Sequence, residues 1–334
     1  MKKSRVISFD FIRTIAVIGV IVGHSLALAA RASQEMEVIE KYGTVLLRPV
    51  VPAFLFLSGI FYRPNQSGRE AGIRLARIIT PYLFFAAVFT VIYGIQRIRY
   101  APLNYLLRIF TGEIHPIYYY VFLMMEFTVA LFVLEKIFGY ERMLIPLFIT
   151  AMVLSILHGS FSKEIMERTG IKDSMVLFYT YRSPLLWGIY YMAGMAFGHY
   201  PNLLKKTIKY KRWIRCMFAG IVAFYILMAY FELGDLDGLN SVITILICFF
   251  AILCLLTIPV KSERWTYFSK RSYTIYLAHV PFYYFMERIW NTQFSLPAIF
   301  MIVINLGIMG GGALLICALG KMILKEHSYY IIGS

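Results

Sequence analysis

The sequence has 334 residues, of which 60% are hydrophobic and only 15% are charged, and its mean hydropathy is +0.68. This composition excludes a soluble globular protein, because apolar runs long enough to cross a bilayer recur from end to end. The formal net charge of +15 does not indicate nucleic-acid binding, since the basic residues cluster between apolar segments, as the topology signals of membrane proteins do.

Apolar windows of about 20 residues predict an all-α, polytopic integral membrane bundle of about ten transmembrane helices. No stretch is expected to form a separate soluble domain, so residues 1–334 are predicted to be one domain. The predicted helices begin near Val6, Gly43, Leu75, His115, Met143, Thr180, Trp213, Leu239, Arg271 and Pro297.

The loop charges predict that both termini lie on the cytoplasmic side. The segment MKKSR precedes the first helix, and the basic runs 205–213 and 261–271 fall in predicted inner loops. The segment RIRYAPLNYLLR, residues 97–108, does not fit this orientation, because it carries arginines in a predicted outer loop. The predicted outer loops also carry the acidic residues Glu35, Glu37, Glu40, Glu232, Asp235 and Asp237.

The first predicted helix contains charged and polar residues in the stretch FDFIRTIAVIGVIVGHS, residues 9–25. A charged side chain at the bilayer centre costs about 2.5–3.5 kcal/mol, so it needs a partner or a watery cavity. Asp10 and Arg13 are three residues apart and can pair. Arg13 and His24 differ by about 20° in direction and by roughly 16 Å along the helix axis, so they line one face at two depths.

Two interpretations of this helix stay open on its residues alone. Asp10 and Arg13 can form a structural ion pair while His24 bonds to a neighbouring helix. Alternatively, His24 acts as a general base, because an imidazole takes a proton near neutral pH. The stretch also has the parts of a cleavable signal peptide, although such a peptide has no use for an ion pair.

The next two stretches carry a proline and two arginines. In RPVVPAFLFLSGIFYRP, residues 48–64, Pro52 is expected to interrupt the helix, while Ser58 and Gly59 indicate close packing or a cavity. In GIRLARIITPY, Arg74 and Arg77 are three residues apart at the predicted cytoplasmic mouth. They suit either phosphate binding or topology anchoring.

The fourth predicted helix opens with the segment HPIYYY, from His115 to Tyr120, in which Tyr119 and its neighbours form an aromatic run. Such a platform can hold a sugar ring or anchor the helix at the interface. Glu126, further along, is an acid in mid-span. It is therefore a functional candidate or the partner of an arginine on another helix.

The ninth predicted helix opens with SKRSYTIYLAHVPFYY, residues 269–284, where Tyr273, Tyr276 and His279 are polar. Tyr276 and His279 are three residues apart and can share a face, for a structural hydrogen bond or for chemistry. The glycine spacings GMAFG (194–198) and GIMGG (307–311) predict close helix contacts. The four cysteines show no CxxC pair, so neither a disulfide nor a metal site is expected.

Taken in order, these stretches resemble the membrane acyltransferase-3 family, whose members O-acetylate sugars and envelope polysaccharides. The first stretch is similar to the family's pattern of an arginine and a histidine separated by ten residues. VPAFLFLSGIFY resembles its proline-to-SGF segment, with Ile60 in place of the usual phenylalanine. RLARIITPY resembles its paired-arginine element, and SYTIYLAHVP is similar to its SYxIYLxH signature.

The resemblance covers nearly the whole chain, with two departures. Many members have a tryptophan at the start of the fourth span, where this chain has only tyrosines. This departure puts in doubt a role for that position in stacking against the acceptor. The chain also ends shortly after the tenth predicted helix, so it is expected to be a stand-alone form without an appended esterase-like domain.

The resemblance implies a multi-pass enzyme of the bacterial cytoplasmic membrane that moves an acyl group from acyl-CoA, and in particular acetyl-CoA, to a hydroxyl of a sugar or envelope glycan. No tightly bound cofactor is implied. His24 would be the general base and Asp10 would hold Arg13, which guides the donor, whereas Arg74 and Arg77 would bind its phosphates. The implied oxyanion or acceptor contacts are Ser58, Tyr273, Tyr276, His279, His115, Tyr119 and Glu126.

A transporter or exporter of a polysaccharide or anion is the alternative, because a polar stripe beside a proline-broken helix also suits transport. No internal repeat pairs the broken helix with a counterpart in the other half of the sequence. A purely structural subunit would leave Arg13 and His24 without a purpose.

Overall fold

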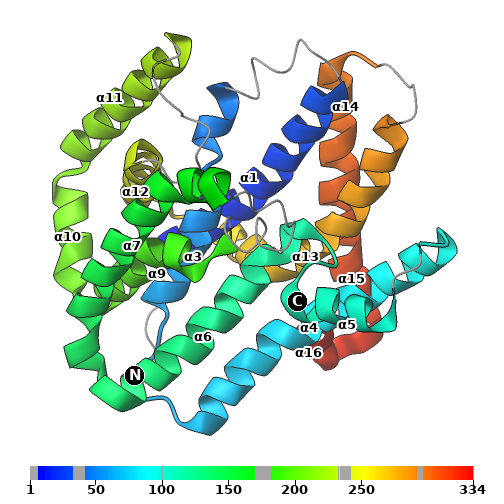
Figure 1. Ribbon diagram of the computed structural model, residues 1–334, viewed down its shortest axis with the longest axis horizontal. Coiled ribbons are helices and arrows are strands. Elements are labelled where there is room, and N and C mark those ends of the chain that lie inside the picture. Colours follow the sequence, from blue (N-terminus) through cyan, green and yellow to red (C-terminus); the bar gives the residue numbers. More distant parts are fainter. Residues whose placement is uncertain are drawn as a thin grey trace. The chain divides into compact units, whose positions relative to one another are not determined.

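The computed structural model describes residues 7–32, 42–98, 101–169, 182–231, 233, 242–291 and 296–333 (Figure 1). Over these ranges the regular structure is helical and contains no strand. Six described helical stretches are long and apolar enough to cross a membrane: Ile7–Arg31, Gly68–Ile95, Pro116–Phe138, Tyr140–His158, Lys211–Tyr230 and Ala298–Ile331. The prediction of an all-α, polytopic membrane protein is therefore confirmed.

The helix bounds follow the predicted order. The longer helices are α1 (Ile7–Ala32), α3 (Val50–Ile60), α4 (Gly68–Ile95), α5 (Pro102–Thr111), α6 (Tyr119–Phe138), α7 (Tyr140–Thr169), α9 (Pro184–His199), α10 (Pro201–Lys209), α11 (Lys211–Tyr230), α12 (Val242–Leu256), α13 (Arg264–Trp290), α14 (Ala298–Leu306) and α15 (Gly312–Leu324). The short helices are η1 (Thr44–Leu46), η2 (Pro116–Tyr118), η3 (Gly307–Gly311), η4 (Lys325–His327) and α16 (Ser328–Ile331).

Some predicted features fall outside the described residues. These are the helix starts at Val6, Thr180 and Leu239, the segment MKKSR up to Arg5, and the acidic residues Glu35, Glu37, Glu40, Glu232, Asp235 and Asp237.

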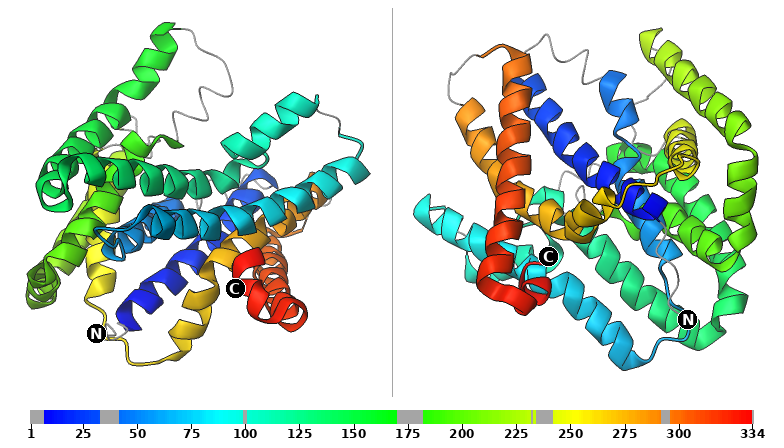
Figure 2. Two further views of the ribbon diagram at one scale, coloured as in Figure 1. Left: turned by 90° about the horizontal axis from the view of Figure 1, so that it is seen from below. Right: turned by 180° about the vertical axis from the view of Figure 1, so that it is seen from behind.

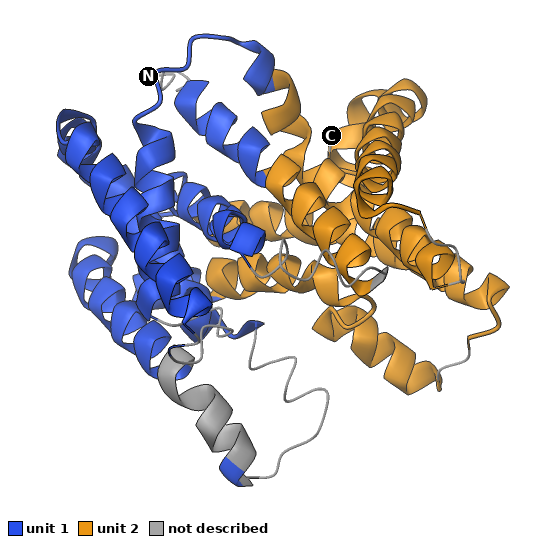
Figure 3. Cartoon of the chain, turned by 90° about the horizontal axis from the view of Figure 1, so that it is seen from above, with its two compact units in different colours: residues 1–16, 42–66, 130–266 blue, residues 17–41, 67–129, 267–334 orange. Residues whose placement is uncertain are grey.

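The chain divides into two compact units (Figure 3). The first unit contains residues 1–16, 42–66 and 130–266, and the second contains residues 17–41, 67–129 and 267–334. The helices α1, α6 and α13 contribute residues to both units.

In the first unit, α9 packs against both α3 and α7, and α11 packs against α12 (Figure 2). The α3–α9 contact brings the two backbones together at glycines. A Cβ atom on Gly59 would lie 2.1 Å from the Tyr191 carbonyl oxygen, and one on Gly194 would lie 1.9 Å from that of Phe56. Both distances are far below van der Waals contact, so only glycine fits. The predicted close packing at these glycines is confirmed.

Pro52 lies in the first turn of α3, which begins at Val50. The first N–H groups of a helix have no acceptor within that helix, so a proline there removes no helical hydrogen bond. The expected interruption at Pro52 is therefore wrong. The predicted helix began near Gly43 and so included both η1 and α3, which put Pro52 in the interior of one predicted span.

In the second unit, α1 packs on α14 through Ala29 and Met301. Asn305 of α14 accepts a 2.8 Å hydrogen bond from the Trp290 indole. The sequence predicted a close helix contact at the glycines of residues 307–311, but the closest contact is made by the next residue, Gly312. Residues 307–311 form a π-helical turn, and a Cβ atom on Gly312 would lie 2.5 Å from the Phe282 ring.

Candidate active site

Two histidines of the second unit stack on each other. His24 comes from α1 and His279 from α13, with ring centroids 5.4 Å apart and ring planes at 23°. The Tyr283 ring meets His24 edge-on at 5.2 Å. His279 and Tyr283 are one helical turn apart, so α13 presents both side chains on one face. Three polar rings therefore meet where α1 passes α13.

His279 is fully buried, and its two ring nitrogens differ in their surroundings. Nδ1 lies 3.3 Å from the Ile275 carbonyl oxygen, which can only accept a hydrogen bond, so Nδ1 carries the hydrogen. Nε2 is buried and has no hydrogen-bond partner among the described residues. In the neutral ring Nε2 then carries a lone pair. A buried polar group without a partner costs about 1–3 kcal/mol, so its retention suggests a bound ligand group.

His115 is a third histidine of this cluster. It is buried at the N-cap of η2, and its Nδ1 accepts the backbone N–H of Ile117 at 3.4 Å. This bond leaves the ring hydrogen of neutral His115 on Nε2, which is a donor. The His115 ring meets Tyr283 edge-on at 5.8 Å and packs 5.4 Å from Phe89.

Two tyrosine hydroxyls form hydrogen bonds between η2 and α13. Pro281 has no N–H, so it leaves the carbonyl of Leu277, four residues earlier, without its helical donor. The Tyr118 hydroxyl donates a 3.0 Å hydrogen bond to that carbonyl. The Tyr276 hydroxyl donates in the other direction, to the Ile117 carbonyl. These bonds explain how a proline is accommodated beside the histidines.

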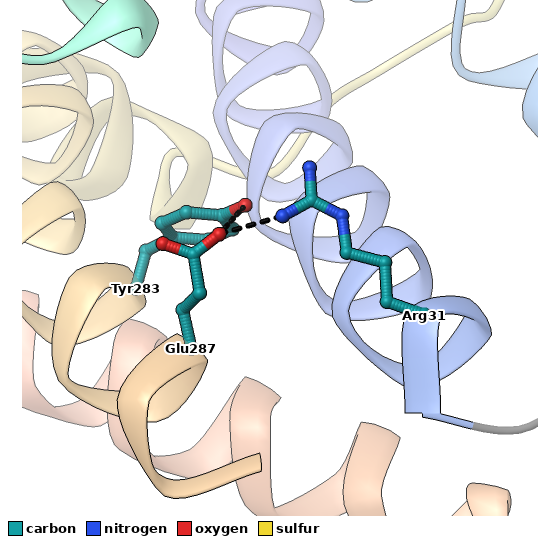
Figure 4. Close-up of polar contacts among 3 residues, drawn as sticks. All are labelled: Arg31, Tyr283 and Glu287. Carbon is teal, nitrogen blue, oxygen red and sulfur yellow. Dashed lines mark hydrogen bonds and ion pairs between the residues drawn. The ribbon is translucent and has the colours of Figure 1, made fainter. Parts of the chain in front are cut away.

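An ion pair joins α1 to α13 beside Tyr283 (Figure 4). Arg31 Nη1 lies 2.6 Å from Glu287 Oε1, and the Tyr283 hydroxyl lies 3.5 Å from the same oxygen. The Arg31 side chain is 62% exposed. The contacts therefore run from the buried histidines through Tyr283 to an exposed charge.

Sequence reasoning did not single out Tyr283, Glu287 or Arg31. A signal was present, because residues 279, 283 and 287 follow one another at intervals of four and so share one helical face.

The hydroxyls predicted as oxyanion or acceptor contacts already donate to backbone carbonyls. Tyr273 donates to the Ile78 carbonyl at 2.7 Å, and Tyr276 donates to that of Ile117. Ser58, which belongs to the first unit, donates to the Phe54 carbonyl at 2.8 Å. A hydroxyl has one hydrogen, so each of these groups would have to break its bond before it could stabilise an oxyanion.

The predicted donor-binding arginines lie on α4 in the second unit. Arg74 is half-buried, whereas Arg77 is exposed with its guanidinium carbon 5.4 Å from the centre of the Tyr329 ring. They are three residues apart on a continuous helix and hence on neighbouring positions of one face.

Asp10 and Arg13 lie in the first unit, whereas His24 lies in the second. Asp10 is buried and accepts a 2.9 Å hydrogen bond from the Thr266 hydroxyl. The Arg13 guanidinium carbon lies 5.4 Å from the centre of the Phe61 ring. The start of α1 is thus joined to α13 by polar contacts within the first unit.

Tyr119 and Glu126 lie on α6 in the second unit and are both half-buried. Within the described ranges, no group of three or more His, Cys, Asp or Glu side chains is arranged to hold a metal ion.

A comparison with protein families gives one match. The model of a family described as an acyltransferase domain, Acyl_transf_3, matches residues 6–320. No curated protein and no solved structure matches the chain. The matched range contains His24, His115 and His279, together with Arg74 and Arg77.

Proposed function

The chain belongs to the Acyl_transf_3 family of acyltransferases, and from that premise we propose that it moves an acyl group from cytoplasmic acyl-CoA to a sugar hydroxyl. The acyl group is acetyl and the acceptor is a glycan of the bacterial envelope. The family and the membrane-spanning helices together make the chain a membrane acyltransferase.

The stacked pair of His24 and His279 is the observation that supports this proposal most strongly. An acyl transfer to a hydroxyl needs a base, and an imidazole is the side chain suited to that task near neutral pH. The pair lies beside a buried lone pair that no described residue uses. Such an arrangement suits the binding of a hydroxyl group.

In the proposed reaction, His24 takes the proton of the acceptor hydroxyl as its oxygen attacks the thioester carbonyl. The C–S bond of the tetrahedral intermediate then breaks, and the imidazolium returns the proton to the departing CoA thiolate. The products are the O-acyl ester and free CoA thiol. His279 Nε2 has an unused lone pair and can accept a hydrogen bond from the acceptor sugar, whereas the Nε2–H of His115 can donate to a developing oxyanion.

The donor would enter at α4. Arg74 and Arg77 would bind CoA phosphates, because two guanidinium groups on one helix face provide several N–H donors for phosphate oxygens. Arg13 would guide the pantetheine arm. The exposure of Arg77 and the spacing of the pair support this assignment.

The test uses the full chain in proteoliposomes with acetyl-CoA that is labelled in the acetyl group. Labelled glycan should appear together with free CoA thiol in equal amounts. The double variant Arg74→Gln/Arg77→Gln should raise the apparent KM for acetyl-CoA far more than that for the acceptor. Arg69→Gln is the matched control, because Arg69 is an exposed arginine in the first turn of the same helix. An unchanged donor KM in the double variant would leave both arginines as topology signals.

The same vesicles distinguish the transporter alternative. A transporter would move glycan or anion across the bilayer without consuming acyl-CoA. The helix break at Pro52, which favoured transport in the sequence, is not present in α3. Comparing the masses of envelope glycans with and without the gene would identify the acceptor and the acyl group together.

A further inference from the structure

The helix α5 presents an apolar stripe that no described residue covers. Leu103, Leu106, Leu107 and Phe110 follow the spacing of one helical face, and 69%, 51%, 43% and 72% of their respective surfaces are exposed. None of the residues in α5 is buried. A soluble protein rarely exposes such a continuous stripe, so it indicates a contact surface.

The rest of α5 is fastened to α4 within the second unit. The Tyr105 hydroxyl donates to Thr90 Oγ1 at 2.6 Å, and the Tyr82 hydroxyl donates to the Ile109 carbonyl at 2.6 Å. The helix therefore has a fixed orientation relative to α4. The leucines and the phenylalanine face away from the elements that hold the helix.

The length and chain position of α5 identify the surface that the stripe meets. α5 has 10 residues, so it is about 15 Å long, which is half of the roughly 30 Å needed to cross the hydrocarbon core. It connects two membrane spans, Gly68–Ile95 and Pro116–Phe138. A segment between the ends of two spans lies at a membrane surface, which places the stripe beside lipid.

Basic residues accompany the stripe. Arg97 is exposed just before α5, and Arg108 is half-buried in its last turn, on the side away from the leucines. A short helix with an apolar face and basic residues on or beside its other face typically lies in the interface of a bilayer that contains anionic lipids. In α5 the basic residue within the helix is Arg108, and Arg97 precedes the helix.

We propose that α5 is an in-plane helix whose stripe of Leu103, Leu106, Leu107 and Phe110 rests in the boundary between headgroups and acyl chains. The exposed Arg97, which precedes the helix, is then placed to contact anionic headgroups, and Arg108 adds positive charge near the same surface. This assignment explains why residues 97–108 carry positive charge on the side of the membrane where the topology rule predicts little.

The anchored helix also fixes one edge of the histidine cluster. The Ile114 N–H donates to the Arg108 carbonyl at 3.0 Å, and the Tyr93 hydroxyl donates to the Ile114 carbonyl at 2.8 Å. His115 follows directly. Contact of α5 with lipid therefore restrains the segment that places the His115 ring against Tyr283.

Spin-label accessibility tests the proposal without any activity measurement. Single cysteines at Leu103, Leu107, Phe110 and, as the control, Asn104 are introduced into a chain whose Cys216 and Cys254 are replaced by serine and whose buried Cys248 and Cys317 are replaced by alanine. Each is labelled with a nitroxide in vesicles of phosphatidylcholine with phosphatidylglycerol. Collisions with oxygen report lipid, and collisions with a water-soluble nickel chelate report water.

We expect labels at 103, 107 and 110 to favour oxygen at least about tenfold more than the label at 104, since the stripe is buried about 5–10 Å into the boundary. Equal exposure of all four labels to the nickel chelate would overturn the proposal, because the helix would lie in water. Stripe labels shielded from both reagents would also overturn it, because a protein would cover the helix. Neither outcome depends on whether the acyl-transfer proposal holds.

Discussion

Two buried carboxylates of the first unit and the buried His279 of the second unit differ in their hydrogen bonding. In the first unit, the buried carboxylate of Asp10 accepts from Thr266, and the buried carboxylate of Glu135 accepts from the Tyr62 hydroxyl and the Asn65 backbone. In the second unit, Nε2 of the fully buried His279 has no partner among the described residues. Satisfied groups stabilise a fold, whereas an unsatisfied one costs stability and suits a ligand. The comparison assigns packing to these two carboxylates and a ligand-binding role to His279, although the first unit also holds a buried nitrogen without a partner among the described residues, Nδ1 of the half-buried His158.

The largest expected effect on the fold is in the first unit. Gly194→Val should destabilise the protein by about 3 kcal/mol or more, because the new side chain meets the Phe56 backbone, which cannot rotate away. The fraction of folded protein after heating in detergent measures this loss. Gly220→Ala is the control, since nothing lies within 4 Å of its Cβ position. Equal melting of the two variants would show that α3 and α9 do not hold the unit together.

A substitution at the histidine cluster of the second unit should lower activity more than stability. His279→Leu removes both the unpartnered Nε2, which costs stability, and the Nδ1 hydrogen bond to the Ile275 carbonyl, which contributes to it, so stability should change by less than about 1 kcal/mol while acyl transfer falls about 100-fold. His199→Ala is the matched control, because that histidine pairs with exposed Glu141 in the first unit. A proportionate loss of stability and activity in His279→Leu would make the residue structural and remove the contrast between the units.

Thr266→Val tests the start of α1 in the first unit. It removes the hydroxyl that donates to Asp10, and a hydrogen bond to a charged group contributes about 1.5–3 kcal/mol. We expect a lower unfolding temperature with kcat changed less than about threefold. A tenfold fall in kcat at unchanged stability would instead give Asp10 a direct part in the reaction.

The smallest effect is expected at Glu287. In its ion pair with Arg31, the arginine side chain is 62% exposed and the glutamate side chain 25% exposed, so solvent screens the pair and it contributes about 0–1 kcal/mol, equivalent to at most about a fivefold change in kcat if that energy positions Tyr283. Glu287→Gln should show this small fall at unchanged KM. The reversed pair Arg31→Glu/Glu287→Arg should restore the rate if the ion pair positions Tyr283, and a failure to restore it would leave the pair without that role.

Much of the fold was predictable because the length of an apolar run reports a membrane helix directly. The predicted starts at Gly43, Trp213 and Pro297 lie close to the observed helices η1, α11 and α14. Pro52 was misinterpreted, because a 3-10 turn and an α-helix share one apolar run. Helix α5 was not predicted, because its stripe is too short to register as a span and its arginines were taken as loop charges.

The types of residue in the site could be predicted from the sequence, but the contacts between them could not. Spacing along single helices indicated that His24 and His279 were unusual, but nothing in a linear sequence shows that their rings stack. Nor does it show that the hydroxyls of Tyr273 and Tyr276 donate to backbone carbonyls, because both bonds join segments far apart in the chain. Tyr283 was missed because an aromatic run near a helix end also suits interfacial anchoring.

The most direct test of the account is the single-turnover rate of His24→Ala with labelled acetyl-CoA in proteoliposomes, measured beside binding of the donor. We expect transfer to fall about 10²–10⁴-fold, the usual contribution of a general base, with acetyl-CoA binding and thermal unfolding unchanged. Transfer at the unsubstituted rate by a folded His24→Ala protein would contradict the central claim that the histidine pair performs the chemistry.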